Sequence, residues 1–332
     1  MKKLFAWILI LAMLLSLAAC GNKKDNSGES ATKVDYKETL KDTMQKTGEF
    51  LHGNVKEATF GSVGGEWLIL GLARSGMEIP EEYYETYFQN VSTYTAQQGG
   101  VLHAKKYTEY SRVILAVTAI NQDPADVGGF NMLVPLADFE QTVFQGINGP
   151  IFALLALDSG NYEIPENIAD STQATRDLYV DYIINAQLEN GGWCLMGGEA
   201  EIDLTAMALQ ALAKYQDRKD VAEAVEKGLA ILSERQNEQG GYQYNAAEAE
   251  SSESVSQVIV ALSELGIALD DSRFVKNGNT LLDALLQFQQ ADNGFSHLMD
   301  GETDLLATEQ AFYALVAADR VAQGESSLYR MK

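Results

Sequence analysis

A short motif that recurs three times in the second half of the chain limits its fold to a helical repeat. In each copy a glutamine is followed four residues later by two small residues and then an aromatic one. The copies run from Gln187 to Trp193, from Gln236 to Tyr242 and from Gln289 to Phe295. Their period of roughly 50 residues is typical of architectures in which each unit buries its apolar face against its neighbours.

Each motif lies between two segments with helical patterns. The preceding segment is amphipathic, over 172–188, 221–235 and 275–290. The following segment is rich in alanine and leucine, over 204–215, 255–265 and 305–318. One unit is therefore an amphipathic helix, a tight turn and an apolar helix.

The same alternation continues, with less regular turns, through the first half of the chain. Apolar helices are predicted over 67–74, 110–120 and 150–157, and amphipathic ones over 36–51, 81–98 and a short 136–144. An apolar helix must be buried, whereas an amphipathic helix faces solvent on one side. Six of each can close into a ring with the apolar helices inside, which needs no capping repeats. We therefore predict an all-α fold, an α6/α6 toroid, in a single domain over residues 36–320, followed by a tail over 321–332.

The glutamine-to-aromatic repeat resembles that of the protein prenyltransferase and squalene cyclase superfamily, whose fold is an α/α toroid. Residues 148–154 and 274–278 also resemble secreted Firmicutes members related to the α domain of intrinsic factor and transcobalamin. The first resemblance implies a site at the N-terminal ends of the inner helices. The second implies a corrinoid ligand, although no β domain like that of intrinsic factor follows the repeats.

The candidate binding residues are those that the predicted ring brings to one mouth. Six helix N-termini that point into one cavity present free N–H groups and a positive end of each helix dipole. The predicted ligand-binding residues are Glu66, Trp67, Tyr110, Arg112, Asn148, Trp193, Asp203, Tyr242, Gln257, His297, Glu309 and Gln310. The competing interpretation is that the aromatic residues of the motif pack in the core and that Asp203 caps its helix.

The catalytic motifs of the resembled enzymes are missing. Residues 201–204 and 302–305 are the nearest strings to the Asp-x-Asp-Asp of a cyclase, and neither has the adjacent pair of aspartates. The Asp-x-Cys pair of a prenyltransferase zinc site is also missing, although Cys194, Asp203 and His297 remain a formal alternative. A glycosidase needs two carboxyl groups across a cleft, for which Glu66, Asp203 and Glu309 are candidates.

We therefore expect no catalytic residue, metal or cofactor, and predict a non-catalytic protein that binds a small molecule, with a corrinoid as the first candidate. Two alternatives stay open. One is an enzyme of terpene cyclase, prenyltransferase-like or carbohydrate-active type with a non-standard site. The other is a module that binds a protein or the cell wall.

The N-terminus is typical of a bacterial lipoprotein precursor. Two lysines precede an apolar run over 4–15, and residues 17–21 read Leu-Ala-Ala-Cys-Gly. The run is too short for a membrane span of ~20 residues. We predict a signal peptide over 1–19, lipidation of Cys20 and a polar tether over 20–35. This places the protein on the extracellular face of the cell membrane, in a Gram-positive cell.

Charge narrows the range of partners. A net charge of −23 argues against nucleic acid and against electrostatic attachment to anionic lipid. The predicted partners are the membrane, through the lipid on Cys20, a small-molecule ligand, and a partner lipoprotein or transporter. The other cysteine, Cys194, has no predicted disulfide partner.

We predict that Cys20→Ala prevents lipidation, so that the protein is released from membranes or left unprocessed, because the thiol is the atom that carries the lipid. Cell fractionation and the size of the mature protein measure this. Cys194→Ala is the control and should fractionate as the wild type does. An alanine variant at position 20 that stayed in membranes at the mature size would contradict the prediction.

Overall fold

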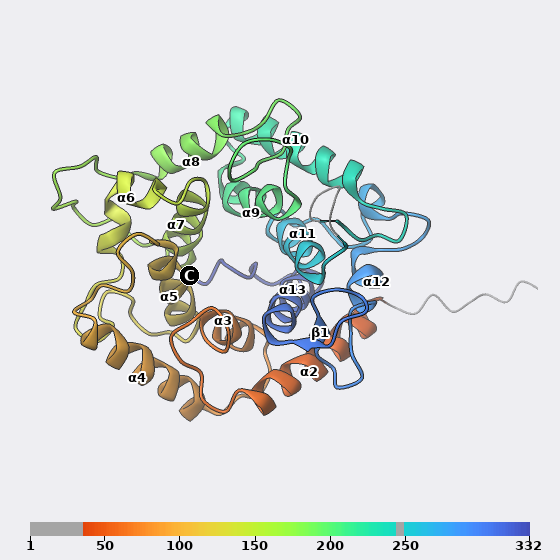
Figure 1. Ribbon diagram of the computed structural model, residues 1–332, viewed down its shortest axis with the longest axis horizontal. Helices are drawn as coiled ribbons and strands as arrows, with labels where there is room; N and C mark the ends of the chain where they lie inside the picture. Colours follow the sequence, from red (N-terminus) through yellow and green to blue (C-terminus); the bar gives the residue numbers. More distant parts are fainter. Residues whose placement is uncertain (1–35, 244–248) are drawn as a thin grey trace, which may run out of the picture. The chain divides into compact units, whose positions relative to one another are not determined.

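The computed structural model describes residues 36–243 and 249–332; the predicted signal peptide, Cys20 and the tether lie outside this part of the chain. Six of its helices are apolar and pack side by side. They are α3 (Glu66–Arg74), α5 (Thr108–Ala119), α7 (Asn148–Ser159), α9 (Ile202–Leu212), α11 (Ser252–Glu264) and α13 (Leu305–Gln323). Each contacts the next in this order, and α13 contacts α3, so the contacts run in a cycle (Figure 1).

A second helix precedes each inner one along the chain and packs outside it (Figure 1). These outer helices are α2 (Tyr36–Asn54), α4 (Glu81–Gln97), α6 (Phe139–Val143), α8 (Arg176–Asn185), α10 (Lys219–Arg235) and α12 (Leu281–Leu286). The described residues also form the 3-10 turns η1 (Val134–Ala137), η2 (Ala213–Tyr215) and η3 (Ser272–Phe274), and the two-residue strands β1 (Phe295–Ser296) and β2 (Thr303–Asp304). The predicted all-α toroid is confirmed, including the alternation of inner and outer helices.

Two outer helices are shorter than the sequence predicts, because local hydrogen bonds fix where they begin. The side chain of Thr175 accepts a hydrogen bond from the backbone N–H of Leu178, which starts α8. The chain just before it is extended and bonds back to residues 137–139. Thr280 and Asp283 form a reciprocal capping box that starts α12, after a tight turn over 276–279.

The glutamine of the repeat is a structural brace. The Gln236 amide donates to the carbonyl oxygen of Gly240, within its own turn, at 3.0 Å. It also donates to the carbonyl oxygen of Phe274, in the next repeat, at 2.9 Å. Gln187 makes the equivalent bonds to Gly191 and Ala224, both at 2.8 Å. The spacing of four residues therefore lets one side chain close its turn and tie it to the neighbouring unit.

The aromatic residue of the motif is a core residue. Trp193 and Tyr242 are fully buried. The Trp193 indole donates to the carbonyl oxygen of Ile183 at 2.7 Å, and the Tyr242 hydroxyl donates to that of Leu232 at 2.9 Å. In both repeats the acceptor lies ten residues earlier in the chain. The prediction that these two side chains line the mouth is wrong, because both are buried and their polar atoms donate hydrogen bonds to carbonyl oxygens of the preceding outer helix.

Residues 321–332, predicted as a separate tail, belong by their contacts to the same unit as the ring. Leu328 and Tyr329 are buried. The end of the chain lies among the inner helices in Figure 1. No helix in the described part of the chain is long and apolar enough to span a membrane.

We predict that Gln236→Ala lowers the free energy of unfolding by about 2 kcal/mol, because it removes two hydrogen bonds and leaves buried carbonyl oxygens without a donor. Chemical denaturation measures this. Gln239→Ala, at an exposed position of the same turn, is the control and should change stability by less than about 0.5 kcal/mol. Equal stabilities for the two variants would contradict the role of the brace.

Candidate functional site

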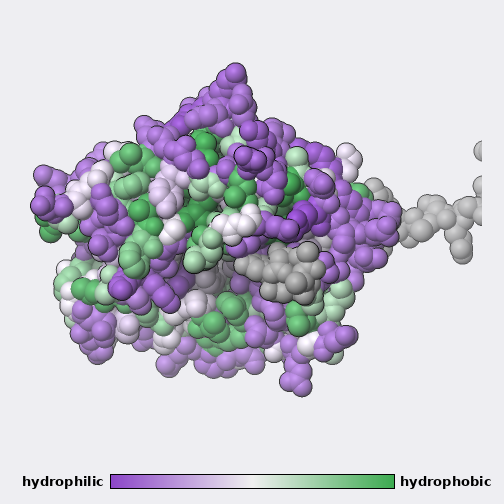
Figure 2. Space-filling view, turned by 45° about the horizontal axis from the view of Figure 1, so that its top comes forward, coloured by the Kyte–Doolittle hydropathy of each residue, from purple (hydrophilic) through white to green (hydrophobic). Residues whose placement is uncertain are grey.

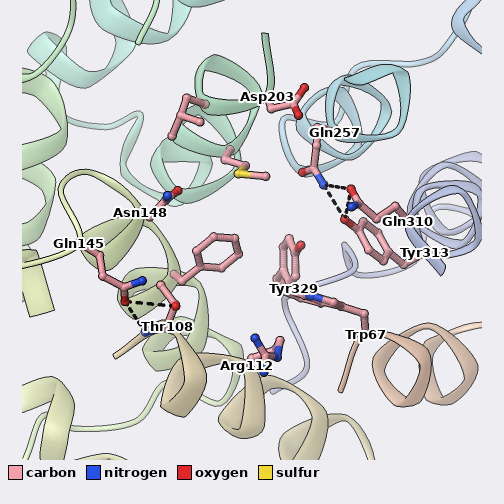
Figure 3. Close-up of a pocket in the computed structure, with 13 residues that line it drawn as sticks. Trp67, Thr108, Arg112, Gln145, Asn148, Asp203, Gln257, Gln310, Tyr313 and Tyr329 are labelled. Atoms are coloured by element: carbon pink, nitrogen blue, oxygen red, sulfur yellow. Dashed lines mark hydrogen bonds between the residues drawn. The ribbon is translucent and has the colours of Figure 1, made fainter. Parts of the chain in front are cut away.

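A cavity of about 330 Å³ lies where the N-terminal ends of the inner helices meet. All six inner helices contribute side chains from their N-terminal halves, and the segment before α7 and the chain after α13 complete the wall. The lining residues are Trp67, Thr108, Arg112, Gln145, Asn148, Phe152, Asp203, Leu204, Met207, Gln257, Gln310, Tyr313 and Tyr329 (Figure 3). Because each inner helix enters the ring in the same direction, residues from the whole length of the chain converge here.

A second cavity of about 430 Å³ adjoins the first, since Asp203 and Gln310 line both. Ser251, Glu253 and His297 lie in its wall. Nδ1 of His297 lies 2.8 and 2.9 Å from the two carboxylate oxygens of Glu253. The imidazole is more than half exposed, whereas the Glu253 carboxylate is only 13% exposed. Among the described residues the wall of the second cavity is therefore acidic, and the basic side chain in it, His297, lies towards the solvent.

Aromatic rings form one side of the first cavity. Trp67 lies 5.9 Å from Phe152 and 5.7 Å from Tyr313, measured between ring centroids, with the rings tilted. Tyr329, from the chain after α13, lies beside them (Figure 3). Such a wall offers apolar ring faces to the less polar surface of a ligand.

Carboxamide groups supply most of the polar lining. The Gln257 amide donates to Oε1 of Gln310 at 2.8 Å and to the Tyr313 hydroxyl at 2.5 Å. Gln145 accepts hydrogen bonds from the backbone N–H and the hydroxyl of Thr108, both at 3.2 Å. The amide nitrogens of Gln310 and Gln145, and both polar atoms of the Asn148 side chain, make no hydrogen bond within the described residues. These groups are free to donate to or accept from a ligand.

The cation of the first cavity, Arg112, is neutralised by its neighbours. Its Nε lies 2.8 Å from the fully buried Glu66 carboxylate, and a second nitrogen pairs with Glu109. Glu66 also accepts hydrogen bonds from the Gly61 N–H at 3.1 Å. With two carboxylates on one guanidinium, Arg112 offers no unpaired positive charge to an anionic ligand.

Asp203 is the carboxyl group that lines both cavities. It is the second residue of α9, so it is not the N-cap, which is Glu201. Oδ1 of Asp203 is buried and has no hydrogen-bond partner, while the Ser254 side chain bonds to the carboxyl group. Burial raises the pKa of Asp203 to about 6, and the nearby Glu253 and Glu201 add to this shift.

The structure separates the predicted site residues into two groups. Trp67, Arg112, Asn148, Asp203, Gln257 and Gln310 line the first cavity, and His297 lines the second. The prediction that Glu66, Tyr110, Trp193, Tyr242 and Glu309 also surround the cavity is wrong, because their side chains are buried elsewhere. The Tyr110 hydroxyl, for example, accepts the N–H of Leu102 at 3.1 Å.

Several lining residues are absent from the sequence prediction. Phe152 and Tyr313 lie four and three residues after predicted site residues on the same helices, so helical periodicity could have found them. Tyr329 comes from the predicted tail, and no pattern in the sequence marks it as part of the site.

The structure does not support two of the sites considered from the sequence, a glycosidase carboxyl pair and a zinc site. Glu66 and Glu309 are fully buried and do not line the cavities, so neither can be the second carboxyl of a glycosidase pair with Asp203 there. In the described residues no three His, Cys, Asp or Glu side chains are arranged to hold a metal ion. Cys194, Asp203 and His297 therefore do not form the zinc site considered from the sequence.

Comparison with known proteins establishes the fold. No family model and no curated protein sequence matches the chain. A type II terpene cyclase from Scytonema superposes with a TM-score of 0.57 and 12% identity, over 86% of this chain and 98% of that one. Candida albicans protein geranylgeranyltransferase-I gives 0.55 and 13%, over 86% and 92%. An unsaturated glucuronyl hydrolase from Bacillus sp. GL1 gives 0.55 and 11%, over 90% and 99%.

These proteins are α/α toroids with different activities, so the likeness assigns the architecture and no reaction. The chain is an α/α toroid. The narrower resemblance to intrinsic factor gains no support from the comparisons.

We predict that Glu309→Gln changes the free energy of unfolding by an amount that depends on pH. Oε1 of Glu309 accepts the Gly64 N–H at 2.7 Å, and Oε2 is buried without a partner. Burial raises the pKa of Glu309 to about 8. A raised pKa means that the folded state holds the proton more tightly than the unfolded state. The stability from this group is therefore complete below about pH 4.5 and is lost as the pH rises to about 8.

Glutamine stays neutral, so the stability difference between the variant and the wild type should move in favour of the variant by roughly 3 kcal/mol from pH 5 to pH 8. Denaturation of both proteins at the two pH values measures it, with Glu238→Gln on the exposed surface as the control. A difference that is constant with pH would show that Glu309 is ionised in the folded protein.

Proposed function

We propose that this protein is a lipid-anchored, extracytoplasmic binder of a small, hydroxyl-rich molecule, such as a short saccharide. The observation that carries the proposal is the pairing of free carboxamide groups with an aromatic wall in one preformed cavity. Carboxamides both donate to and accept from hydroxyl groups, and aromatic faces pack against the C–H faces between them. The cavity of about 330 Å³ is at the small end of the range for ligand sites.

The charges of the site support the same ligand class. A prenyl diphosphate needs unpaired cations, and Arg112 is already paired with two carboxylates. The corrinoid expected from sequence resemblance is far larger than a short saccharide, and so fits a small cavity less well. It is included in the binding experiment as the alternative ligand. The lipid anchor at Cys20 would keep such a binder at the cell surface, where a partner lipoprotein or transporter could receive the ligand.

A second candidate function is the cleavage of a bound saccharide. It is favoured by Asp203, whose pKa is raised to about 6 by burial and which lies in the shared wall of the two cavities. A carboxyl group of this kind can act as a general acid near neutral pH. The binding experiment separates the two functions, because a cleaving enzyme would release shorter products and a binder would return the saccharide intact.

We predict that Asn148→Ala weakens saccharide binding about fivefold or more at nearly unchanged stability, because the Asn148 side chain makes no hydrogen bond within the described protein. Calorimetry and thermal denaturation of residues 21–332 measure both effects. The ligand panel contains neutral and amino disaccharides, corrinoids and an isoprenoid diphosphate.

Gln239→Ala is the control and should bind as the wild type does. Tight binding of a corrinoid or a diphosphate with no saccharide binding would overturn the proposed ligand class. Saccharide binding that is insensitive to Asn148→Ala would place the site outside this cavity.

A further inference from the structure

We propose that the ligand carries a positively charged amine, which Asp203 and Glu253 bind where the two cavities meet. This rests on the proposed function and adds a charge to the ligand class. It concerns the second cavity, which the saccharide argument leaves without a role.

Charge is distributed unevenly over the two cavities. On the α5 side, Arg112 is matched by Glu66 and Glu109. On the α9 and α11 side, Asp203 and Glu253 line the cavity, and Glu201 lies close enough to Asp203 to act on its charge. Among the described residues the basic side chain facing this cluster is His297, on the connection between β1 and β2, and it pairs with Glu253. A cationic ligand group would therefore meet an excess of negative charge.

In the described part of the chain, two carboxylate oxygens of the cluster have no hydrogen-bond donor. Oδ1 of Asp203 and Oε2 of Glu201 are both buried without a partner within the described residues. Buried carboxylate oxygens are normally paired, and an unpaired one is a cost to the empty protein. Because Asp203 lines both cavities, an ammonium group at their junction could donate to its carboxyl group and offset the negative charge of the cluster.

The neighbouring aromatic wall suits the same group. Figure 3 shows Asp203, Gln257, Tyr313 and Trp67 following one another along one side of the cavity. A carboxylate beside aromatic faces is the combination that binds amines, since the negative face of each ring attracts a cation. The Gln310 and Gln257 amides lie between them and would hold the adjoining hydroxyl groups.

The test compares ligands that differ only in this charge. The probes are the glucosamine disaccharide, its N-acetylated counterpart and a disaccharide that contains a uronic acid. Binding to residues 21–332 is measured by calorimetry at pH 7 for the wild type, Asp203→Asn and Glu253→Gln. Glu238→Gln, an exposed acidic position away from both cavities, is the matched control.

We expect the wild type to prefer the amine to the N-acetylated disaccharide at least tenfold and to bind the uronic acid most weakly. Asp203→Asn should reduce the preference below threefold, because the affinity for the amine falls more than the affinity for the N-acetylated disaccharide. Glu253→Gln should reduce it in the same direction, and the control should keep it. Asparagine at 203 fills the same space, so a loss of the preference with an unchanged melting temperature reports on charge.

The preference should also fall between pH 7 and pH 5. Burial raises the pKa of Asp203 to about 6, so its carboxyl group gains a proton in this range. The charged groups that face it are Glu201 before α9, Glu253 on α11 and His297 after β1. Protonation of Asp203 removes one negative charge from this cluster and so weakens its attraction for a cation.

The outcomes are separable. Equal affinity for the amine and the N-acetylated disaccharide would overturn this inference and leave the proposed function standing. A preference that survives Asp203→Asn and Glu253→Gln together would also overturn it. If no saccharide binds, both the inference and the proposed function are wrong.

Discussion

The packing of α13 on α3 is the contact on which the arrangement depends, because it joins the last inner helix to the first. Phe312 is fully buried there. A Cβ atom at Gly71 would lie 2.8 Å from its ring, and one at Gly48 of the outer helix α2 would lie 2.9 Å from it. Glycine at both positions lets the large ring fill the seam. Without this closure α3 and α13 would each expose an apolar face, and the six N-terminal ends would not enclose one cavity.

Buried polar groups then position the mouth. Glu66 holds the N–H of Gly61 and the guanidinium of Arg112, and Glu309 holds the N–H of Gly64. The loop before α3 is thus tied to α5 and α13 by two carboxyl groups, which fixes Trp67 at the edge of the cavity. These buried carboxyl groups stabilise a particular loop conformation, and their removal would affect the shape of the site as well as the stability of the fold.

The fold was more predictable than the site, for a physical reason. Repeated patterns report burial, and burial decides which helices lie inside, so the six inner helices were found close to their observed bounds. The direction of a single side chain at a turn depends on local hydrogen bonds instead. Trp193 turns into the core because its indole donates to the carbonyl oxygen of Ile183, and Asp203 lies two residues after Glu201, the N-cap of α9. Neither fact is encoded in a periodicity.

The position of the end of the chain is likewise not predicted by any sequence pattern, although this segment completes the cavity. Arg74, Ser159 and Glu264, the last residues of α3, α7 and α11, all bind it. Arg74 donates to the carbonyl oxygen of Ser327 at 2.8 Å, and Glu264 accepts the backbone N–H of Tyr329 at 3.2 Å. These anchors lie at the C-terminal ends of alternate inner helices, opposite the mouth.

A segment held at three points around the ring can place one aromatic side chain in its centre, and Tyr329 lines the floor of the cavity accordingly. The end of the chain therefore closes the side of the cavity that lies towards the C-terminal ends of the inner helices, so the ring alone does not define the site.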